Sequence, residues 1–202
     1  MEAVSMVHPA RFLSSIFLAV FLMSAGCFSD QHVREVVEIP HTWANVGDLK
    51  LLQQQGVLYY DGVPYSGYTY DRFQNGDTSR LTPYYHGKEE GWMKAWYPNR
   101  QLNELRFFSN GKKEGIHKGW WDSGKPKFEY HFDNDEHEGE LKEWYANGAP
   151  ARFFHYSNGH EEGSQKMWWE NGDVRANYAV IAGDRFGLTG QKLCSNSSKS
   201  QQ

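Results

Sequence analysis

The sequence predicts an all-β protein, an elongated single-layer repeat sheet of stacked antiparallel β-hairpins with a 24-residue period. A glycine recurs at this spacing, at Gly67, Gly91, Gly115, Gly139, Gly163 and Gly187. Aromatic residues and lysines repeat at the same step, and Asn-Gly pairs separate short stretches that are rich in aromatics. A period of this length, held without insertion, is typical of a repeat architecture.

The N-terminal stretch, residues 1–26, predicts a signal peptide of the lipoprotein type. Its apolar run, residues 12–23, is too short to span a membrane comfortably but suits a signal-peptide core. The run ends in Ser24-Ala25-Gly26-Cys27, and small residues before a cysteine resemble the lipobox of bacterial lipoproteins. The resemblance implies that Cys27 is lipidated and becomes the mature N-terminus. The position three before the cysteine is usually leucine and here is Ser24, so secretion without a lipid and an uncleaved anchor helix are the alternatives.

The predicted location is therefore the bacterial cell envelope, with the N-terminal lipid as the membrane attachment. Residues 27–55 are interpreted as a tether and lead-in, and residues 189–202 as a disordered polar tail. Cys27 and Cys194 are the two cysteines, and if Cys27 is not acylated a disulfide between them is conceivable. The net charge of −4 argues against a nucleic-acid partner, which would require a basic stripe.

Residues 56–188 form the predicted repeat domain, in which each unit reads as two strands and two turns. In the Gly91 unit, residues 91–97 and 102–108 are the expected strands. Asn-Gly pairs supply the positive-φ positions that tight hairpin turns need. Residues 56–67 predict a degenerate first hairpin, and residues 178–188 predict a half-unit that closes the other end.

Three further residue types keep a fixed distance from the repeat glycine. Lysine follows it by three residues and tryptophan by five, which places both on one face of a strand. We call these residues the Lys–Trp row: Lys94, Trp96, Lys118, Trp120, Lys142, Trp144, Lys166 and Trp168. A glutamate column precedes the glycine, at Glu90, Glu114, Glu138 and Glu162.

Units such as Asn110-Gly111-Lys112-Lys113-Glu114-Gly115, followed by Trp120-Trp121, resemble bacterial MORN-variant repeats. The resemblance covers about residues 56–188 and implies a twisted sheet of successive hairpins with no catalytic residues to carry over. Many members of this family are exported or lipidated, and some are labelled antitoxins of toxin–antitoxin systems. The chain departs from the family pattern at Asp135, which replaces a turn glycine, and at Tyr70, which replaces the first lysine.

No catalytic cluster, metal site or cofactor site is predicted. A carboxylate pair of the glycosidase kind would single out one unit, whereas the glutamate column recurs in four units. His131 and His155 lie one period apart, but two histidines need further ligands to hold a metal. The expected protein is therefore not an enzyme.

The Lys–Trp row has two interpretations. In the structural one, the lysine stems lie over the tryptophan rings; in the functional one, the row is a binding strip. The leading prediction is an envelope-tethered repeat protein that presents a β surface to another protein. The alternatives are a carbohydrate-binding module that uses the tryptophans to hold an envelope polysaccharide, and an antitoxin-type neutraliser of a partner toxin.

Overall fold

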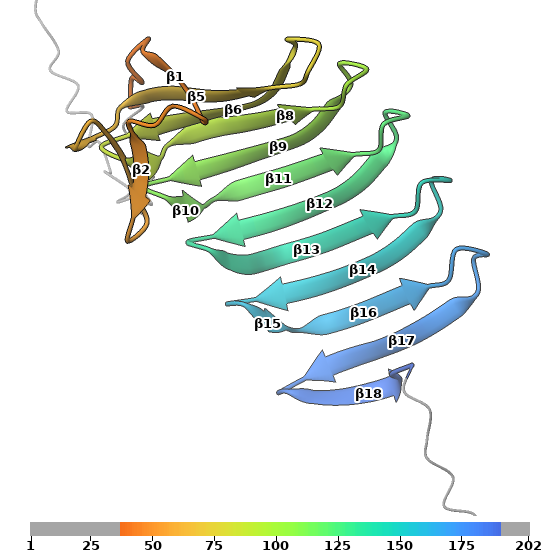
Figure 1. The fold of residues 1–202 in the computed structure, drawn as a ribbon. Helices are drawn as coiled ribbons and strands as arrows, with labels where there is room; N and C mark the ends of the chain where they lie inside the picture. Colours follow the sequence, from red (N-terminus) through yellow and green to blue (C-terminus); the bar gives the residue numbers. More distant parts are fainter. Residues whose placement is uncertain (1–36, 191–202) are drawn as a thin grey trace, which may run out of the picture. The chain divides into compact units, whose positions relative to one another are not determined.

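The computed structural model describes residues 37–190, and in this part of the chain all regular secondary structure is β-strand. Fifteen strands form one open sheet in the order β1-β5-β6-β8-β9-β11-β12-β13-β14-β16-β17-β18, with β7, β10 and β15 pairing on β6, β9 and β14 (Figure 1). The all-β hairpin prediction is confirmed. The predicted signal peptide, Cys27 and Cys194 lie outside the described residues.

The main sheet consists of one hairpin after another. Its pairs are antiparallel except β1 with β5, which is parallel. The strands are β1 (Trp43–Asn45), β5 (Gly67–Arg72), β6 (Thr78–Tyr85), β7 (Lys88–Glu89), β8 (Gly91–Trp96), β9 (Leu102–Ser109), β10 (Lys112–Lys113), β11 (Gly115–Trp120), β12 (Pro126–Asp133), β13 (Glu136–Trp144), β14 (Pro150–Ser157), β15 (His160–Glu161), β16 (Gly163–Trp168), β17 (Val174–Ile181) and β18 (Asp184–Leu188). The repeat glycine opens β5, β8, β11 and β16, so the 24-residue period is the distance between equivalent strands.

The tight turns at one end of the hairpins explain the Asn-Gly pairs. Asn110 and Gly111 both have positive φ (51° and 81°), as do Asn158 and Gly159 (48° and 76°). Two consecutive positive-φ residues define the type I′ turn, whose twist matches that of the flanking strands. Asp135 adopts the same conformation without a glycine, at φ 75°, so the departure seen in the sequence leaves the turn geometry unchanged.

Every buried side chain of the repeat region from Gly91 onward lies on one face of the sheet, which we call the packed face. Its buried residues are Met93, Ala95, Phe108, His117, Phe128, Phe132, Leu141, Phe154, Gln165, Ala176, Tyr178 and Val180. Because strand side chains alternate between faces, the Lys–Trp row lies on the opposite face, which we call the Lys–Trp face.

A ladder of rings runs along the packed face from unit to unit. Neighbouring centroids are 5.5, 4.7, 4.4 and 5.1 Å apart along Phe108, His117, Phe132, His137 and Tyr156. Equivalent aromatics are too far apart to touch directly, so the two imidazoles fill the spaces between them. The core of the sheet is therefore a thin aromatic layer.

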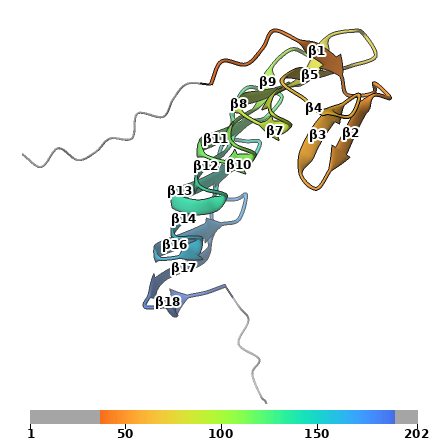
Figure 2. The same ribbon diagram turned by 90° about the vertical axis from the view of Figure 1, so that its left-hand side faces the viewer.

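The first repeat is covered by the lead-in segment. β1 pairs with β5 and places Trp43 in a stack on Tyr68, with ring centroids 4.8 Å apart. A second sheet of β2 (Leu51–Gln54), β3 (Val57–Tyr60) and β4 (Val63–Pro64) lies beside the first strands of the main sheet (Figure 2). Leu58 N–H donates to the Gly87 carbonyl at 2.7 Å, which joins the two sheets. Within the predicted 27–55 tether, residues 43–45 and 51–54 are thus strands of the fold.

Candidate interaction face

The glutamate column holds turns. A glutamate oxygen accepts the backbone N–H of the first residue of the next tight turn in three units: Glu90 from Asn110 (2.7 Å), Glu114 from Asn134 (3.1 Å) and Glu138 from Asn158 (2.7 Å). The partners are always 20 residues apart. A carboxylate that accepts a backbone N–H in three successive units stabilises the tight turns, which accounts for the recurrence of Glu90, Glu114 and Glu138.

A second column fixes the tryptophans of the Lys–Trp row. The side chain six residues after the repeat glycine donates to a Trp carbonyl of the following unit: Tyr97 to Trp120 (3.0 Å), Trp121 to Trp144 (3.1 Å) and Tyr145 to Trp168 (2.9 Å). The sequence indicates the donors, because each is a tyrosine or tryptophan with a polar group at the end of its ring. It does not indicate the acceptors, because each is a backbone carbonyl of the next unit.

The lysines of the row differ from one another. Lys118 Nζ lies 3.0 Å from Glu129 Oε2, and Lys142 donates to Glu140 at 2.6 Å. Lys94 and Lys166, at the ends of the row, are exposed and have no ion pair within residues 37–190. In the Lys–Trp row, Lys94 and Lys166 are therefore exposed cations, whereas the charges of Lys118 and Lys142 are neutralised by glutamates.

Glu129 shows how the paired positions are balanced. Burial by itself would raise the pKa of Glu129, but the ammonium of Lys118 and the imidazole of His131 more than offset this, and the pKa is lowered. Glu129 is thus a stable anion at neutral pH and serves as a structural counter-ion.

The tryptophans of the last two units form an aromatic cluster with the phenylalanine between them. Phe153 meets Trp144 at a centroid distance of 5.6 Å and Trp168 at 5.3 Å, in both cases edge to face. All three rings are half-buried. The cations that lie over indole rings come from another column, Lys127 over Trp121 at 4.8 Å and Arg175 over Trp169 at 4.6 Å.

An open hollow of about 600 Å³ lies on the Lys–Trp face beside this cluster, between β13, β14 and β16. Its polar lining alternates in charge, and Phe153 contributes the apolar part. The lining residues are Glu140, Lys142, Phe153, Phe154, His155, Glu162, Gly163, Ser164 and Lys166. The hollow can therefore take a ligand that combines apolar surface with hydrogen-bonding or charged groups.

The equivalent hollow near the N-terminal end of the sheet has a volume of about 410 Å³. Leu81 and Lys94 occupy there the repeat positions that Phe153 and Lys166 occupy in the other hollow. Ile39, His41 and Trp43, three alternate residues of the lead-in segment, also line it. The chain itself thus places a segment with apolar and aromatic side chains, bent at His41 where Thr42 N–H donates to the Pro40 carbonyl, against this type of hollow.

The packed face carries a polar group of its own. Tyr130 donates to Glu143 Oε1 at 2.7 Å, and Arg152 Nη1 lies 3.5 Å from the same oxygen while its guanidinium lies over Phe154. Burial, together with the neighbouring Glu143, raises the pKa of Tyr130 far above its ordinary value. A phenol held neutral in this way is a hydrogen-bond donor in the packed layer.

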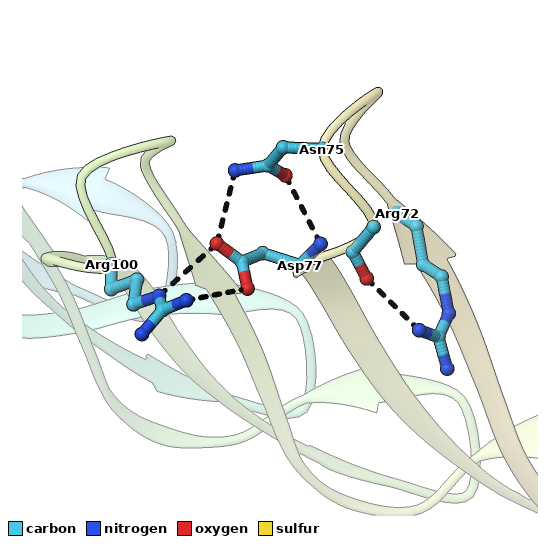
Figure 3. Close-up of polar contacts among 5 residues, drawn as sticks. Arg72, Asn75, Asp77 and Arg100 are labelled. Carbon is cyan, nitrogen blue, oxygen red and sulfur yellow. Dashed lines mark hydrogen bonds and ion pairs between the residues drawn. The ribbon is translucent and has the colours of Figure 1, made fainter.

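At the other end of the hairpins the turns are longer, and an ion pair between Asp77 and Arg100 joins the first two of them (Figure 3). Arg100 donates through Nε and Nη2 to the two oxygens of Asp77, at 3.1 and 3.0 Å, and Asn75 Nδ2 donates to Asp77 as well. These bonds, the Arg100 pair foremost, hold the pKa of Asp77 below its usual range. Arg100 has φ 66° at a position where the other units have glycine, so a side chain that links two turns replaces the residue best suited to the backbone.

No group of three or more histidine, cysteine, aspartate and glutamate side chains lies close enough within residues 37–190 to hold a metal ion. Nor do these residues contain a helix long and apolar enough to cross a membrane.

Comparison of the chain with models of known protein families gives no match, and comparison with curated proteins gives none. The functional interpretation therefore depends on the geometry of the Lys–Trp face.

Proposed function

We propose that the chain is a non-enzymatic repeat protein, held in the bacterial cell envelope by a lipid on Cys27, that presents its Lys–Trp face to a partner protein. The observation that carries the proposal is the open hollow at Phe153. The apolar side chains of the packed face bury one another, whereas the Trp144–Phe153–Trp168 cluster remains half-exposed beside an open lysine. Aromatic anchors with a polar rim are the usual composition of a protein-binding patch.

The chemistry of the partner follows from the hollow near the N-terminal end of the sheet. A segment that presents alternate side chains, one aliphatic and one or two aromatic, suits a hollow of this kind, as Ile39, His41 and Trp43 do near the N-terminal end of the sheet. Lys166 adds a preference for an acidic residue beside the apolar anchor, because it is exposed and has no ion pair within residues 37–190. We therefore expect a partner segment that combines acidic, aliphatic and aromatic residues.

Site-specific photo-crosslinking in intact cells tests this proposal. A photoreactive residue at Ser164, inside the hollow, should yield one predominant cross-linked protein, and Lys166→Glu should reduce its yield severalfold. The matched control is the same photoreactive residue at Lys112, which is an exposed residue of the short strand β10, next to a turn and outside the hollow. Identical products from positions 164 and 112, or no effect of Lys166→Glu, would show that the hollow does not bind the partner.

Carbohydrate binding is the second candidate, and the aromatic cluster is the observation that favours it. Half-exposed rings beside Ser164, Glu140 and Glu162 offer a stacking surface together with hydrogen-bonding groups. The experiment is a glycan array with the native chain, followed by Trp144→Ala and Trp168→Ala. Loss of a specific signal in both variants supports this function, and a blank array for the native chain removes it.

A further inference from the structure

The last strand of the described residues, β18, is an unpaired sheet edge within that part of the chain. All five of its residues are exposed, and Phe186 and Leu188 show 57% and 56% of their surface. At the opposite end, β1 and the β2–β4 sheet cover the first repeat. Within residues 37–190, β17 is the strand that pairs with β18, and no other strand pairs with it. Natural sheets usually protect such edges with proline, charge or a bulge, because free backbone groups recruit another strand.

The register of the last hairpin identifies the backbone groups that are free. Its turn is Ala182-Gly183, with φ values of 53° and 88°, and Ile181 is paired with Asp184. In an antiparallel ladder the hydrogen-bonding groups alternate between the two sides of a strand. The backbone N–H and C=O of Asp184, in the closing pair, therefore point toward β17. The backbone N–H and C=O of Arg185 and Gly187 point outward, away from β17.

The side chains of β18 make this edge self-complementary. Phe186 and Leu188 lie opposite Ala179 and Asn177, which places both on the Lys–Trp face. The charge nearest to the edge is already neutralised, since Arg185 donates to Glu161 at 2.9 Å on the packed face. Asp184, at the turn end of β18, is exposed and lies on the same face as Phe186 and Leu188, so the register of a neighbouring strand must keep it away from these two apolar side chains.

We propose that two copies of this chain pair antiparallel through β18, about a two-fold axis at Gly187. In this register each Phe186 lies opposite Leu188 of the partner subunit, so the pair occurs once on either side of the axis. The outward backbone N–H and C=O of Gly187 face the same groups of the partner's Gly187. A register centred on Phe186 would instead set Asp184 against an apolar side chain. The axis is perpendicular to the sheet, so the Lys–Trp faces of both copies continue into one surface.

Sedimentation of the full chain tests the proposal, in mild detergent because of the apolar run at residues 12–23, and under reducing conditions to exclude disulfides of Cys27 and Cys194. The disrupting variant is Phe186→Lys with Leu188→Lys, which sets lysine opposite lysine. The restoring variant is Phe186→Glu with Leu188→Lys, which sets positions 186 and 188 opposite each other with opposite charges in the proposed register, whereas a register centred on Phe186 would set glutamate opposite glutamate. Leu49→Lys changes a fully exposed leucine far from β18 and is the control.

We expect the native chain and Leu49→Lys to dimerise, measured at concentrations up to about 1 mM because the interface is small. The double lysine variant should weaken association by about tenfold or more, and the Glu/Lys variant should recover it. Circular dichroism should be unchanged throughout, since both altered side chains are more than half exposed.

Three results would overturn the proposal. The first is a monomeric native chain, including one in which the amides of Arg185 and Gly187 resist hydrogen exchange because another segment of the same chain covers them. The second is a double lysine variant that associates as well as the native chain. The third is a Glu/Lys variant as weak as the double lysine variant, which would exclude the register about Gly187.

Discussion

His117 and Gln165 occupy the same repeat position, two residues after the glycine, and are the most deeply buried large side chains of the described residues, with 1% and 0% exposure. His117 Nε2 lies 2.8 Å from the Phe107 carbonyl, and Gln165 Nε2 donates to the His155 carbonyl at 2.8 Å. Both carbonyls belong to the equivalent residue of the preceding unit, ten positions away. An imidazole and an amide thus satisfy the same buried carbonyl, as a buried polar group requires.

This equivalence leads to a pH prediction. Burial lowers the pKa of His117, against the opposing bond to Phe107, and Arg106 and Lys113 lower it further. The unfolded chain therefore takes up a proton at higher pH than the folded chain, and stability falls as the pH drops below about 6.5. His117→Gln keeps the hydrogen bond and cannot titrate, so it should lose less stability on acidification.

The measurement is the melting temperature at pH 8 and at pH 5 for both proteins. Some pH dependence should remain in His117→Gln, because burial and Lys113 lower the pKa of His137 as well. Equal losses in the native chain and the variant would contradict the role given to His117.

Ala182 supports a second prediction at the residue scale. It occupies the first turn position of the last hairpin at φ 53°, a conformation that favours asparagine over alanine. Ala182→Asn should raise the free energy of unfolding by about 0.5–1 kcal/mol. Urea denaturation measures the change, and Asn158→Ala, at the same turn position, should lower stability by a similar amount. A neutral Ala182→Asn would indicate that the last hairpin frays before the sheet unfolds.

At the scale of the elements, facing side chains on the packed face complement each other in size. Gly119 pairs with Phe128, whereas the equivalent pair two units later is Met167 with Ala176. A side chain built on Gly119 would overlap the ring of Phe128, so the ring occupies the space that methionine fills in the later unit. The two facing side chains of a hairpin thus fill one space on the packed face, with the larger side chain on either strand.

A swap of this pair tests the complementarity. Gly119→Met should destabilise the chain by about 1–3 kcal/mol because the site is already full. Phe128→Ala alone should cost about 3–5 kcal/mol through the cavity that it leaves. The double variant copies the Met167 and Ala176 arrangement and should be more stable than the sum of the single effects predicts, as measured by urea denaturation. Strictly additive effects would show that the two positions do not share a volume.

At the scale of the whole molecule, neighbouring units are tied by three recurrent devices: the strand ladders, the glutamate-to-turn bonds and the bonds to the Trp carbonyls. Each device joins a unit to its direct neighbour. Stability in such an arrangement is the sum of the units and their interfaces. Within residues 37–190, the last of these interfaces is the one between β17 and β18.

The envelope anchor is a prediction at this scale. We expect mass spectrometry of the protein isolated from bacterial membranes to show a diacylated or triacylated Cys27 at the N-terminus, and Cys27→Ser to release the protein from the membrane fraction. A mature protein that begins elsewhere, or an unmodified Cys27, would favour plain secretion. In that case the Lys–Trp face would act in a soluble protein.

The sequence by itself determined the hairpin architecture, because both of its periods are local. The 24-residue step marks equivalent strands and the two-residue alternation separates the faces, so the placement of the Lys–Trp row on one face was predictable. Asn110-Gly111 and Asn158-Gly159 likewise predicted tight turns from neighbouring residues alone, whereas Asn75-Gly76, Asn147-Gly148 and Asn171-Gly172 lie in the longer turns, where only the glycine has positive φ.

The tertiary structure decided which face is packed, what the glutamates bind and where the hollow lies. Each of these three features depends on residues about 10 to 24 positions apart, which the register between units brings together. Examples are Glu90 with Asn110, Tyr97 with Trp120, and Lys142 with Lys166 around Phe153. A repeat pattern shows that columns recur, but it does not contain the offset at which one column meets the next. That offset is set by the twist and bulges of the strands, which exist only in the folded sheet.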